Sequence, residues 1–247
     1  DQFPEDGLKV KWRVPVGLGY SGPAVVGDRI YVMDYERKAG DITNSPGTRI
    51  KLQGQERIIC LNASNGEVVW KHAYDRPYEL SYPSGPRCTP TVNEGRVYAL
   101  GGHGDLICLD AATGNLVWKK DLVDEYKAPT PVWGFSAHPL VAGDLLYCIV
   151  GGEGSVAVAF DKNTGKEVWR SVSAKYPGYC PPRIVKHAGR DLLIIWHPEA
   201  ANALDPLTGK IYWSIPWKIR AGLTIPTPQM IDEEHLFFTC FYNGSML

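Results

Sequence analysis

The sequence predicts an all-β protein, a β-propeller made of four-stranded antiparallel blades. Three observations support this prediction: a repeated turn that ends in tryptophan, a shared glycine-containing stretch before each turn, and a proline further upstream. Four segments of the 247-residue chain align without gaps, at 61–70, 109–118, 160–169 and 204–213. The tryptophans recur every 44 to 58 residues, and this period fits blades of four strands.

The repeated turn consists of an apolar residue, Asp or Asn, two variable residues, Thr, Ser or Asn, then Gly, three more residues and Trp. The acidic side chain can bond forward to the backbone, and the glycine takes a positive φ. The Trp lies on the strand that leaves the turn, where its flat ring can fill the space between neighbouring sheets. The predicted docking motif comprises Trp12, Trp70, Trp118, Trp169 and Trp213, with Asp110, Asp161 and Asp205 and with Gly66, Gly114, Gly165 and Gly209.

Each unit is predicted to hold four strands: A after the proline, B from the glycine-containing stretch, C ending at the Asp, and D carrying the Trp. Alternating runs such as Ile30–Met33 and Val97–Leu100 indicate strands with one buried face. The predicted units are a strand D at 9–16 that closes the last blade, a blade at 20–73 with an inserted loop at 36–57, blades at 87–120, 135–170 and 179–214, and a partial blade at 224–247.

The first residues are expected to mark a domain boundary, whereas Leu247 is expected to fall inside a blade, so that the chain is a fragment. Open blade edges would then favour self-association. A sandwich with coincidentally similar turns is an alternative, but it does not explain four gap-free matches. An α/β fold would need helical periodicity between strands, and the sequence has none.

The charge balance bears on the class of partner. The chain has 26 Lys and Arg against 27 Asp and Glu, which argues against nucleic acid or an anionic membrane as the main partner. No stretch approaches 18 uninterrupted apolar residues, and the N-terminus lacks the pattern of a signal peptide. Most of the six cysteines are predicted to be buried free thiols, because Cys60 and Cys108, and likewise Cys88 and Cys180, hold equivalent positions in different blades, which lie too far apart for a disulfide.

The element Asp-x-x-Thr-Gly-x-x-x-Trp resembles the tryptophan-docking motif of the pyrroloquinoline-quinone (PQQ)-like repeat family. The resemblance covers nearly the whole chain. It implies an eight-bladed propeller when complete and a periplasmic or secreted location. The family includes quinoprotein dehydrogenases and the outer-membrane assembly lipoprotein BamB, so the resemblance does not assign an activity.

In propellers, the ligand face is formed by the connections from strand D to the next strand A and by the hairpins between strands B and C. Arg87 could clamp a carboxylate ligand or pair with a carboxylate across the channel. The hairpin tips could hold a ligand or metal, or could simply be tight turns. Trp133 and Trp217 lie outside the docking positions, and they could be aromatic platforms or could cover the blade tops. The candidates for this face are Tyr20, Arg87, His103, Trp133, His138, Glu153, Tyr179, His197, Glu199 and Trp217.

The leading functional hypothesis is a module that binds a protein partner, a small molecule or a carbohydrate on this face. The alternative is a quinoprotein dehydrogenase that oxidises an alcohol or sugar with PQQ and Ca²⁺, as the resemblance implies. The sequence has no adjacent cysteine pair of the kind that quinoprotein alcohol dehydrogenases use beside PQQ, and no ligand set at zinc spacing. Catalytic residues are not assigned, and no metal ligands are predicted. A purely structural assembly scaffold is the third hypothesis.

Overall fold

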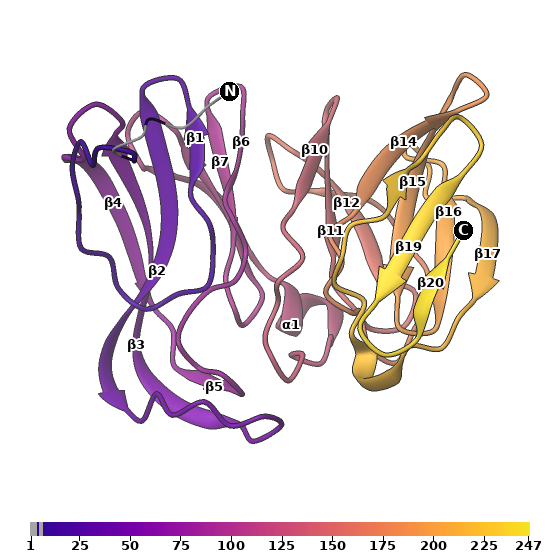
Figure 1. The fold of residues 1–247 in the computed structure, drawn as a ribbon, viewed down its shortest axis with the longest axis horizontal. Coiled ribbons are helices and arrows are strands. Elements are labelled where there is room, and N and C mark those ends of the chain that lie inside the picture. The colour runs from indigo at the N-terminus through magenta and orange to yellow at the C-terminus, as the bar shows by residue number, and fades with distance from the viewer. Residues whose placement is uncertain (1–3, 5–6) are drawn as a thin grey trace.

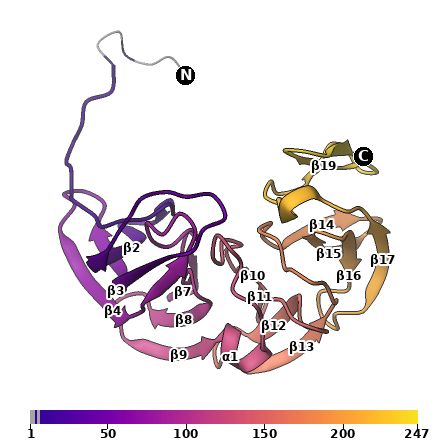
Figure 2. The ribbon, with the colours of Figure 1, turned by 90° about the horizontal axis from the view of Figure 1, so that it is seen from below.

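Five antiparallel sheets follow one another along the chain in a computed structural model that describes residue 4 and residues 7–247. In Figure 1 the sheets stand side by side, and Figure 2 shows them arranged as an arc around a central axis. The arc does not close among the described residues, because the first and the fifth sheet do not meet (Figure 2). The protein is therefore nearly all-β and propeller-like, as the sequence predicts.

Four sheets have at least four strands, and the fifth has three. The first sheet contains β1 (Ala24–Val26), β2 (Arg29–Gly40), β3 (Ile50–Asn62), β4 (Val68–Asp75) and β5 (Tyr78–Leu80). The second contains β6 (Thr91–Asn93), β7 (Arg96–Leu100), β8 (Asp105–Asp110) and β9 (Leu116–Asp121). The third contains β10 (Leu140–Ala142), β11 (Leu145–Ile149), β12 (Ala157–Asp161) and β13 (Glu167–Ser171). The fourth contains β14 (Arg183–His187), β15 (Arg190–His197), β16 (Ala200–Leu204) and β17 (Ile211–Pro216), and the fifth contains β18 (Gln229–Met230), β19 (Leu236–Cys240) and β20 (Gly244–Met246).

Two short helical segments interrupt this pattern: α1 (Leu122–Tyr126) and the 3-10 turn η1 (Arg220–Gly222). The side chain of Asp121 caps the start of α1 by accepting from the backbone N–H groups of Val123 and Asp124. Within the described residues, no helix is both long and apolar enough to span a bilayer.

The tryptophans dock from each blade onto the next one. The indole N–H of Trp70 donates to the carbonyl of Ala111 at 2.9 Å, and that of Trp118 donates to Lys162 at 3.1 Å. Both acceptors directly follow the Asp of the next repeated turn. The same bond joins Trp12 to Ala63 and Trp169 to Pro206. Each docked ring also covers the turn glycine of the next blade, where a Cβ would lie within 2.5 to 2.7 Å of the ring.

The repeated acidic residue shapes the turn on which each Trp docks. Asp110 Oδ1 accepts from the backbone N–H groups of Ala112 and Thr113 and from the hydroxyl of Thr113. Asp161 makes the corresponding three contacts, and Asp205 makes the two backbone contacts. These bonds hold the turn so that its carbonyl and its glycine present a flat docking surface.

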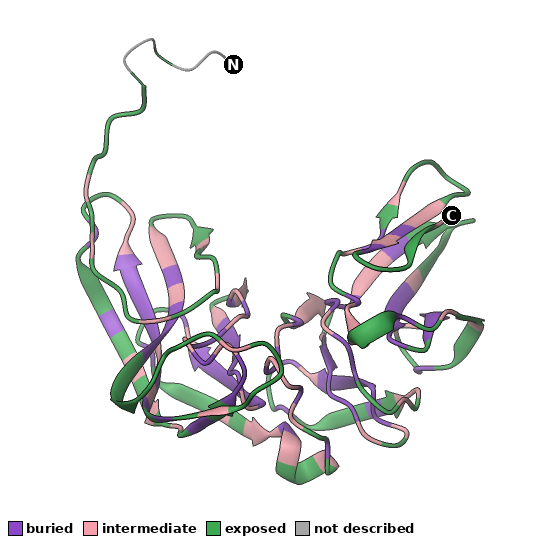
Figure 3. Cartoon of the chain, turned by 60° about the horizontal axis from the view of Figure 1, so that its bottom comes forward, coloured by how far each residue is buried: buried purple, intermediate pink, exposed green. Residues whose placement is uncertain are grey.

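Apolar packing lies between adjacent sheets. One buried cluster joins Tyr31, Met33 and Ile58 of the first sheet to Val97 and Ile107 of the second. Equivalent clusters join the second to the third, the third to the fourth, and the fourth to the fifth sheet. Figure 3 shows the buried residues concentrated on the strands that face a neighbouring sheet. All six cysteines are buried and unpaired, which confirms the predicted free thiols.

The structure of residues 36–57 differs from the predicted inserted loop. Most of this segment is strand, because β2 and β3 form one long hairpin whose pairing continues to Gly40 and Leu52. Only residues 41–49 lie outside the two strands. The physical reason is an alternation along β3 that buries Leu52, Gly54, Glu56 and Ile58 on one face, while β5 adds a further partner strand.

Residues 9–16 differ from the prediction in another way. This segment forms no strand among the described residues, although a strand D was expected there. Its tryptophan nevertheless docks as the others do, with the ring of Trp12 on Gly66 and its N–H on Ala63. The docking contact therefore forms without strand pairing. Whether the segment completes a last blade stays a prediction.

Candidate functional site

A groove of about 990 Å³ lies at one end of the blades, where the connections between sheets meet. This is the lower end of the molecule in Figure 1, opposite the docking turns. We call it the loop-end groove. Its walls come from the tip of the β2–β3 hairpin, from three successive connections between sheets, and from the β15–β16 turn. The lining residues are Arg49, Pro129, Thr130, Pro131, Val132, Lys175, Tyr176, Pro177, Gly178, Tyr179, Pro198, Glu199, Lys218, Ile219, Ala221 and Gly222.

The long hairpin of the first sheet reaches this groove through Arg49. Its guanidinium donates to the carbonyl of Thr130 at 2.7 Å and to that of Glu79 at 3.0 Å. The first bond crosses from the first sheet to the connection between the second and third sheets. The extension of β2 and β3, which lengthens only the first blade, therefore places a cation at the edge of the groove.

Backbone hydrogen bonds fix the opposite wall. The carbonyl of Glu199 accepts from Trp217 N–H at 2.9 Å, and the carbonyl of Pro198 accepts from Ile219 N–H at 2.7 Å. The carboxylate of Glu199 accepts from the backbone N–H of Lys175 at 3.0 Å. These bonds join the β15–β16 turn to the connections on either side of the fourth blade. The wall is therefore preorganised.

The charges of the groove are unbalanced. Arg49, Lys175 and Lys218 line it, and Glu199 is the acidic residue among the lining side chains. Within the part of the chain that the structure describes, none of these three cations has a carboxylate within ion-pair distance. The ammonium group of Lys175 instead lies 5.5 Å from the ring centre of Tyr176, which is half exposed. None of the three is therefore neutralised by a carboxylate of the described residues, so an anionic ligand could pair with them.

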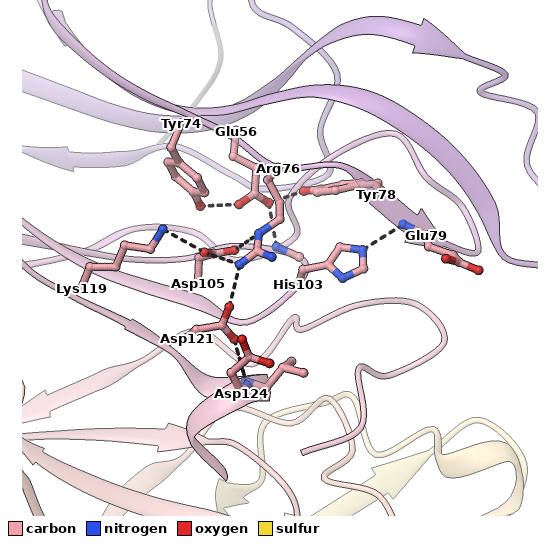
Figure 4. A network of polar contacts seen from close by, with 12 residues as sticks. Glu56, Tyr74, Arg76, Tyr78, Glu79, His103, Asp105, Lys119, Asp121 and Asp124 are labelled. Atoms are coloured by element: carbon pink, nitrogen blue, oxygen red, sulfur yellow. Dashed lines mark hydrogen bonds and ion pairs between the residues drawn. The ribbon is translucent and has the colours of Figure 1, made fainter. Parts of the chain in front are cut away.

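Beside the groove, a buried polar network joins the first and second blades (Figure 4). Glu56 on β3 is fully buried, and its carboxylate accepts from the hydroxyls of Tyr74 and Tyr78. It also accepts from the backbone N–H of Gly102 at 2.7 Å. Burial raises the pKa of Glu56 in spite of these bonds, and the nearby carboxylate of Asp105 adds to the rise.

A cationic side chain bridges the other carboxylates of this network. Arg76 pairs with the fully buried Asp105 and, at 3.0 Å, with Asp121 at the start of α1. Lys119 lies 3.3 Å from Asp105 on the other side. Figure 4 shows Arg76 between the two aspartates. The two cations Arg76 and Lys119 match the two aspartates, and Glu56 is held by hydroxyls and a backbone N–H, so we interpret the network as a structural clamp for the long hairpin.

Four of the predicted ligand-face residues lie in or close to these two features. Tyr179 and Glu199 line the groove, and the ring of Trp133 packs 5.5 Å from that of Tyr179. Burial raises the pKa of Tyr179 to about 12, so its hydroxyl stays protonated at neutral pH. His103 lies in the polar network, where its Nε2 accepts from Glu79 N–H at 2.9 Å. Burial lowers the pKa of His103 to about 4, so the ring is neutral.

Arg87 lies among backbone carbonyls, and its predicted contact with a carboxylate ligand stays a prediction. Its guanidinium donates to the backbone carbonyls of Ser81, Tyr82 and Gly85, and it makes no ion pair with a carboxylate of the described residues. It also lies 5.0 Å from the ring centre of Tyr20, whose hydroxyl donates to Asn44. The pair Tyr20 and Arg87 therefore orders the connection between the first and second blades.

The remaining candidates lie apart from the groove lining. His197 is buried at 3% exposure, and its Nδ1 accepts from the N–H of Glu199. Trp217 stacks on Trp196 with ring centres 5.4 Å apart and planes at 9°, so it covers the end of the fourth blade. His138 and Glu153 are exposed at separate positions along the chain. A ligand role for these four residues stays a prediction.

Sequence reasoning did not single out Arg49, Lys175, Tyr176, Lys218 or Glu56. The first four lie in segments without repeat equivalents, so the alignment of blades assigns them no position. Glu56 carried a usable signal, because it falls on the same alternating face as Leu52 and Ile58. A charged residue at a core-facing position indicates a buried, partnered carboxylate.

The described residues give no direct support for a PQQ and Ca²⁺ site. In the described ranges, no group of three His, Cys, Asp or Glu side chains is placed to hold a metal ion, and no two cysteines are bonded. The carboxylates nearest the groove and network are already held by Arg76, Lys119, two tyrosines and backbone N–H groups. We therefore derive no chemical step through a quinone.

Comparison with known proteins identifies the family. The family model described as outer membrane protein assembly factor BamB matches residues 54–224, which is more than half of the chain. The chain belongs to this family. The predicted PQQ-like repeat β-propeller is thereby confirmed. No curated protein matches the chain.

Solved structures show the same fold. BamB from Moraxella catarrhalis is 20% identical, with a TM-score of 0.61 over 93% of this chain and 61% of that chain. A europium-containing methanol dehydrogenase is 16% identical, with a TM-score of 0.50 over 81% of this chain and 51% of that chain. The quinohemoprotein alcohol dehydrogenase from Comamonas testosteroni is also 16% identical, with a TM-score of 0.50 over 85% and 45% of the two chains. This chain thus spans less than two thirds of the length of each, and the likeness shows the fold alone.

Proposed function

We propose that the chain is part of an extracytoplasmic propeller that binds a protein partner through its loop-end groove. The observation that carries this proposal is the groove itself, which combines walls fixed by backbone bonds with cations that have no carboxylate partner. An open groove built by successive connections offers more contact length than a closed pocket for a small molecule. The family description, an outer membrane protein assembly factor, favours a protein partner and a location outside the cytoplasm.

The other hypotheses receive less support. The dehydrogenase hypothesis rests on a fold shared with two dehydrogenases, while the described residues lack a donor set for PQQ and Ca²⁺. A small-molecule or carbohydrate ligand would use the same aromatic side chains, Tyr176 and Tyr179, without needing three unpaired cations. Self-association through open strand edges and a purely structural scaffold stay predictions.

Site-specific photo-cross-linking in cells that make the protein tests this proposal. A benzophenone amino acid at Tyr176, which is 51% exposed in the groove, is expected to give a defined protein adduct. The matched control is the same substitution at Leu207, which is 72% exposed on the docking turn of the fourth blade. Adducts at Leu207 that equal those at Tyr176, or no adduct at Tyr176, would contradict the proposal.

A further inference from the structure

We infer that the loop-end groove recognises an extended, acidic segment of polypeptide through side-chain contacts. The inference rests on the proposed function and adds the chemistry of the ligand. Arg49, Lys175 and Lys218 come from the first blade and from two separate connections, yet they line one groove. The chain as a whole has a net charge of −1, so this local excess of cations is not a general property of its surface.

The absence of ion pairs at these three cations, within the described part of the chain, supports the inference. Elsewhere in the described residues, cations pair readily with acids: Arg57 with Asp34 at 2.6 Å, Arg96 with Asp110 and Lys120 with Glu125, for example. The exposed Lys175 and Lys218 have no such partner. Arg49 is held by two carbonyls, which orient its guanidinium without neutralising it. Held but unneutralised cations favour carboxylates of a ligand.

The backbone of the groove argues for recognition by side chains. Pro129, Pro131, Pro177 and Pro198 lie in its walls, and proline has no N–H to donate. These prolines interrupt the row of N–H donors along the walls, which disfavours continuous pairing with a bound β-strand. A bound segment can instead contact the proline and tyrosine rings with its apolar groups, while its carboxylates reach the three cations. Tyr176 and Tyr179 supply rigid rings beside Lys175 for such contacts.

The size of the groove favours a polypeptide over a single small acid. Its volume of about 990 Å³ lies at the upper end of ordinary ligand pockets. The three cations come from separate segments of the groove wall, at positions 49, 175 and 218, so a ligand that carries several carboxylates can contact each of them. Several carboxylates spaced along one chain fit this distribution.

The test uses the 247-residue chain and a rhodamine-labelled peptide in which Asp and Glu alternate with Gly and Tyr. Its counterpart carries Asn and Gln at the acidic positions. Fluorescence anisotropy is expected to show about tenfold tighter binding of the acidic peptide, since three exposed charge pairs contribute roughly 0.5 kcal/mol each. Raising the ionic strength is expected to reduce this preference.

Two double variants locate the effect. Lys175→Gln with Lys218→Gln is expected to weaken binding of the acidic peptide about threefold to tenfold. Lys166→Gln with Lys210→Gln removes two exposed lysines from docking turns and is expected to leave binding unchanged. Both pairs are exposed, so the fold is expected to persist, and circular dichroism checks it.

The possible failures are distinguishable. Equal binding of the two peptides, or equal effects of the two double variants, overturns the acidic-segment inference. If Tyr176 still gives a defined cross-link in that case, the proposed function survives with a ligand of different chemistry. If the acidic peptide binds selectively but cross-links at Tyr176 and Leu207 are alike, the groove chemistry stands and the protein partner at this face does not.

Discussion

The two ends of the blades differ in how their residues are used. At the turn end, four tryptophans make equivalent hydrogen bonds to the next blade, and each ring covers the equivalent turn glycine of that blade. At the loop end, each connection is different in length and chemistry, and one blade carries a long hairpin that the others lack. The repeated end holds the architecture together, whereas the variable end holds the groove. The following predictions break or sharpen this comparison.

The largest effect is expected at the turn end. Trp70→Ala removes a ring that is 8% exposed, together with its bond to Ala111. The free energy of unfolding is expected to fall by about 4 kcal/mol, because a large cavity opens between two blades. Urea denaturation followed by circular dichroism measures it. The control is Val68→Ala, on the same strand and 56% exposed, which is expected to change little. Similar losses in both variants would contradict the docking interpretation.

A comparable loss is expected when the loop-end clamp is broken. Asp105→Asn leaves Arg76 and Lys119 without their fully buried partner. The free energy of unfolding is expected to fall by about 3 kcal/mol, because the ion pair with the buried Asp105 is broken and Arg76 keeps only the partly exposed Asp121. Asp121→Asn, whose carboxylate is 29% exposed, is expected to cost less in the same denaturation experiment. A larger loss for Asp121→Asn than for Asp105→Asn would show that the clamp depends on the cap of α1.

Substitutions at two glycines with the same φ angle distinguish the energetic cost of disturbing the docked Trp from the cost of backbone strain. Gly114 and Gly95 both have a φ of +74°, but a Cβ on Gly114 would meet the Trp70 ring at 2.6 Å while Gly95 has open space. Gly95→Ala is expected to cost about 1 kcal/mol through backbone strain alone. Gly114→Ala is expected to cost about 2 kcal/mol more, because the ring must shift. Equal melting temperatures of the two variants would contradict the close contact.

The pH dependence of stability tests the buried Glu56. Its pKa is raised by burial, so folding favours the protonated carboxyl. The resulting contribution to stability is present at pH values below the ordinary glutamate pKa of 4.5. It is lost as the pH rises through the raised pKa of the folded protein. Glu56→Gln cannot ionise, so the decline that Glu56 causes is expected to disappear from its stability curve. Thermal denaturation at a series of pH values measures the difference. Parallel curves for both proteins would show that Glu56 does not titrate with folding.

The smallest effect on stability is expected in the groove. Lys175 and Lys218 are exposed and have no carboxylate partner among the described residues. Replacing both with Gln is therefore expected to change the free energy of unfolding by less than about 0.5 kcal/mol. A larger loss in the same urea titration would assign them a structural role. The groove lining would then contribute to stability as the docking turns do, and the contrast between groove and docking turns would fail.

The sequence predicts the repeated end much better than the variable end. Trp70, Asp110 and Gly114 are recognisable because the same chemistry recurs in each blade at the same spacing. The long hairpin escaped prediction because glycine and charged residues between positions 36 and 57 resemble a loop, although Glu56 faces the core. The groove could not be predicted because its cations come from segments far apart in sequence. Their proximity depends on how the arc of blades brings the connections together.

The forward direction of tryptophan docking has a consequence for how such proteins change. A blade of this kind carries both a tryptophan and a docking turn. The tryptophan of one blade binds the docking turn of the next blade. A duplicated blade would bring its tryptophan and its docking turn with it. It could therefore make the docking bond with the blade before it and with the blade after it. The docking bonds therefore place no limit on the number of blades. That number must be set by the curvature at which the two ends of the ring come together.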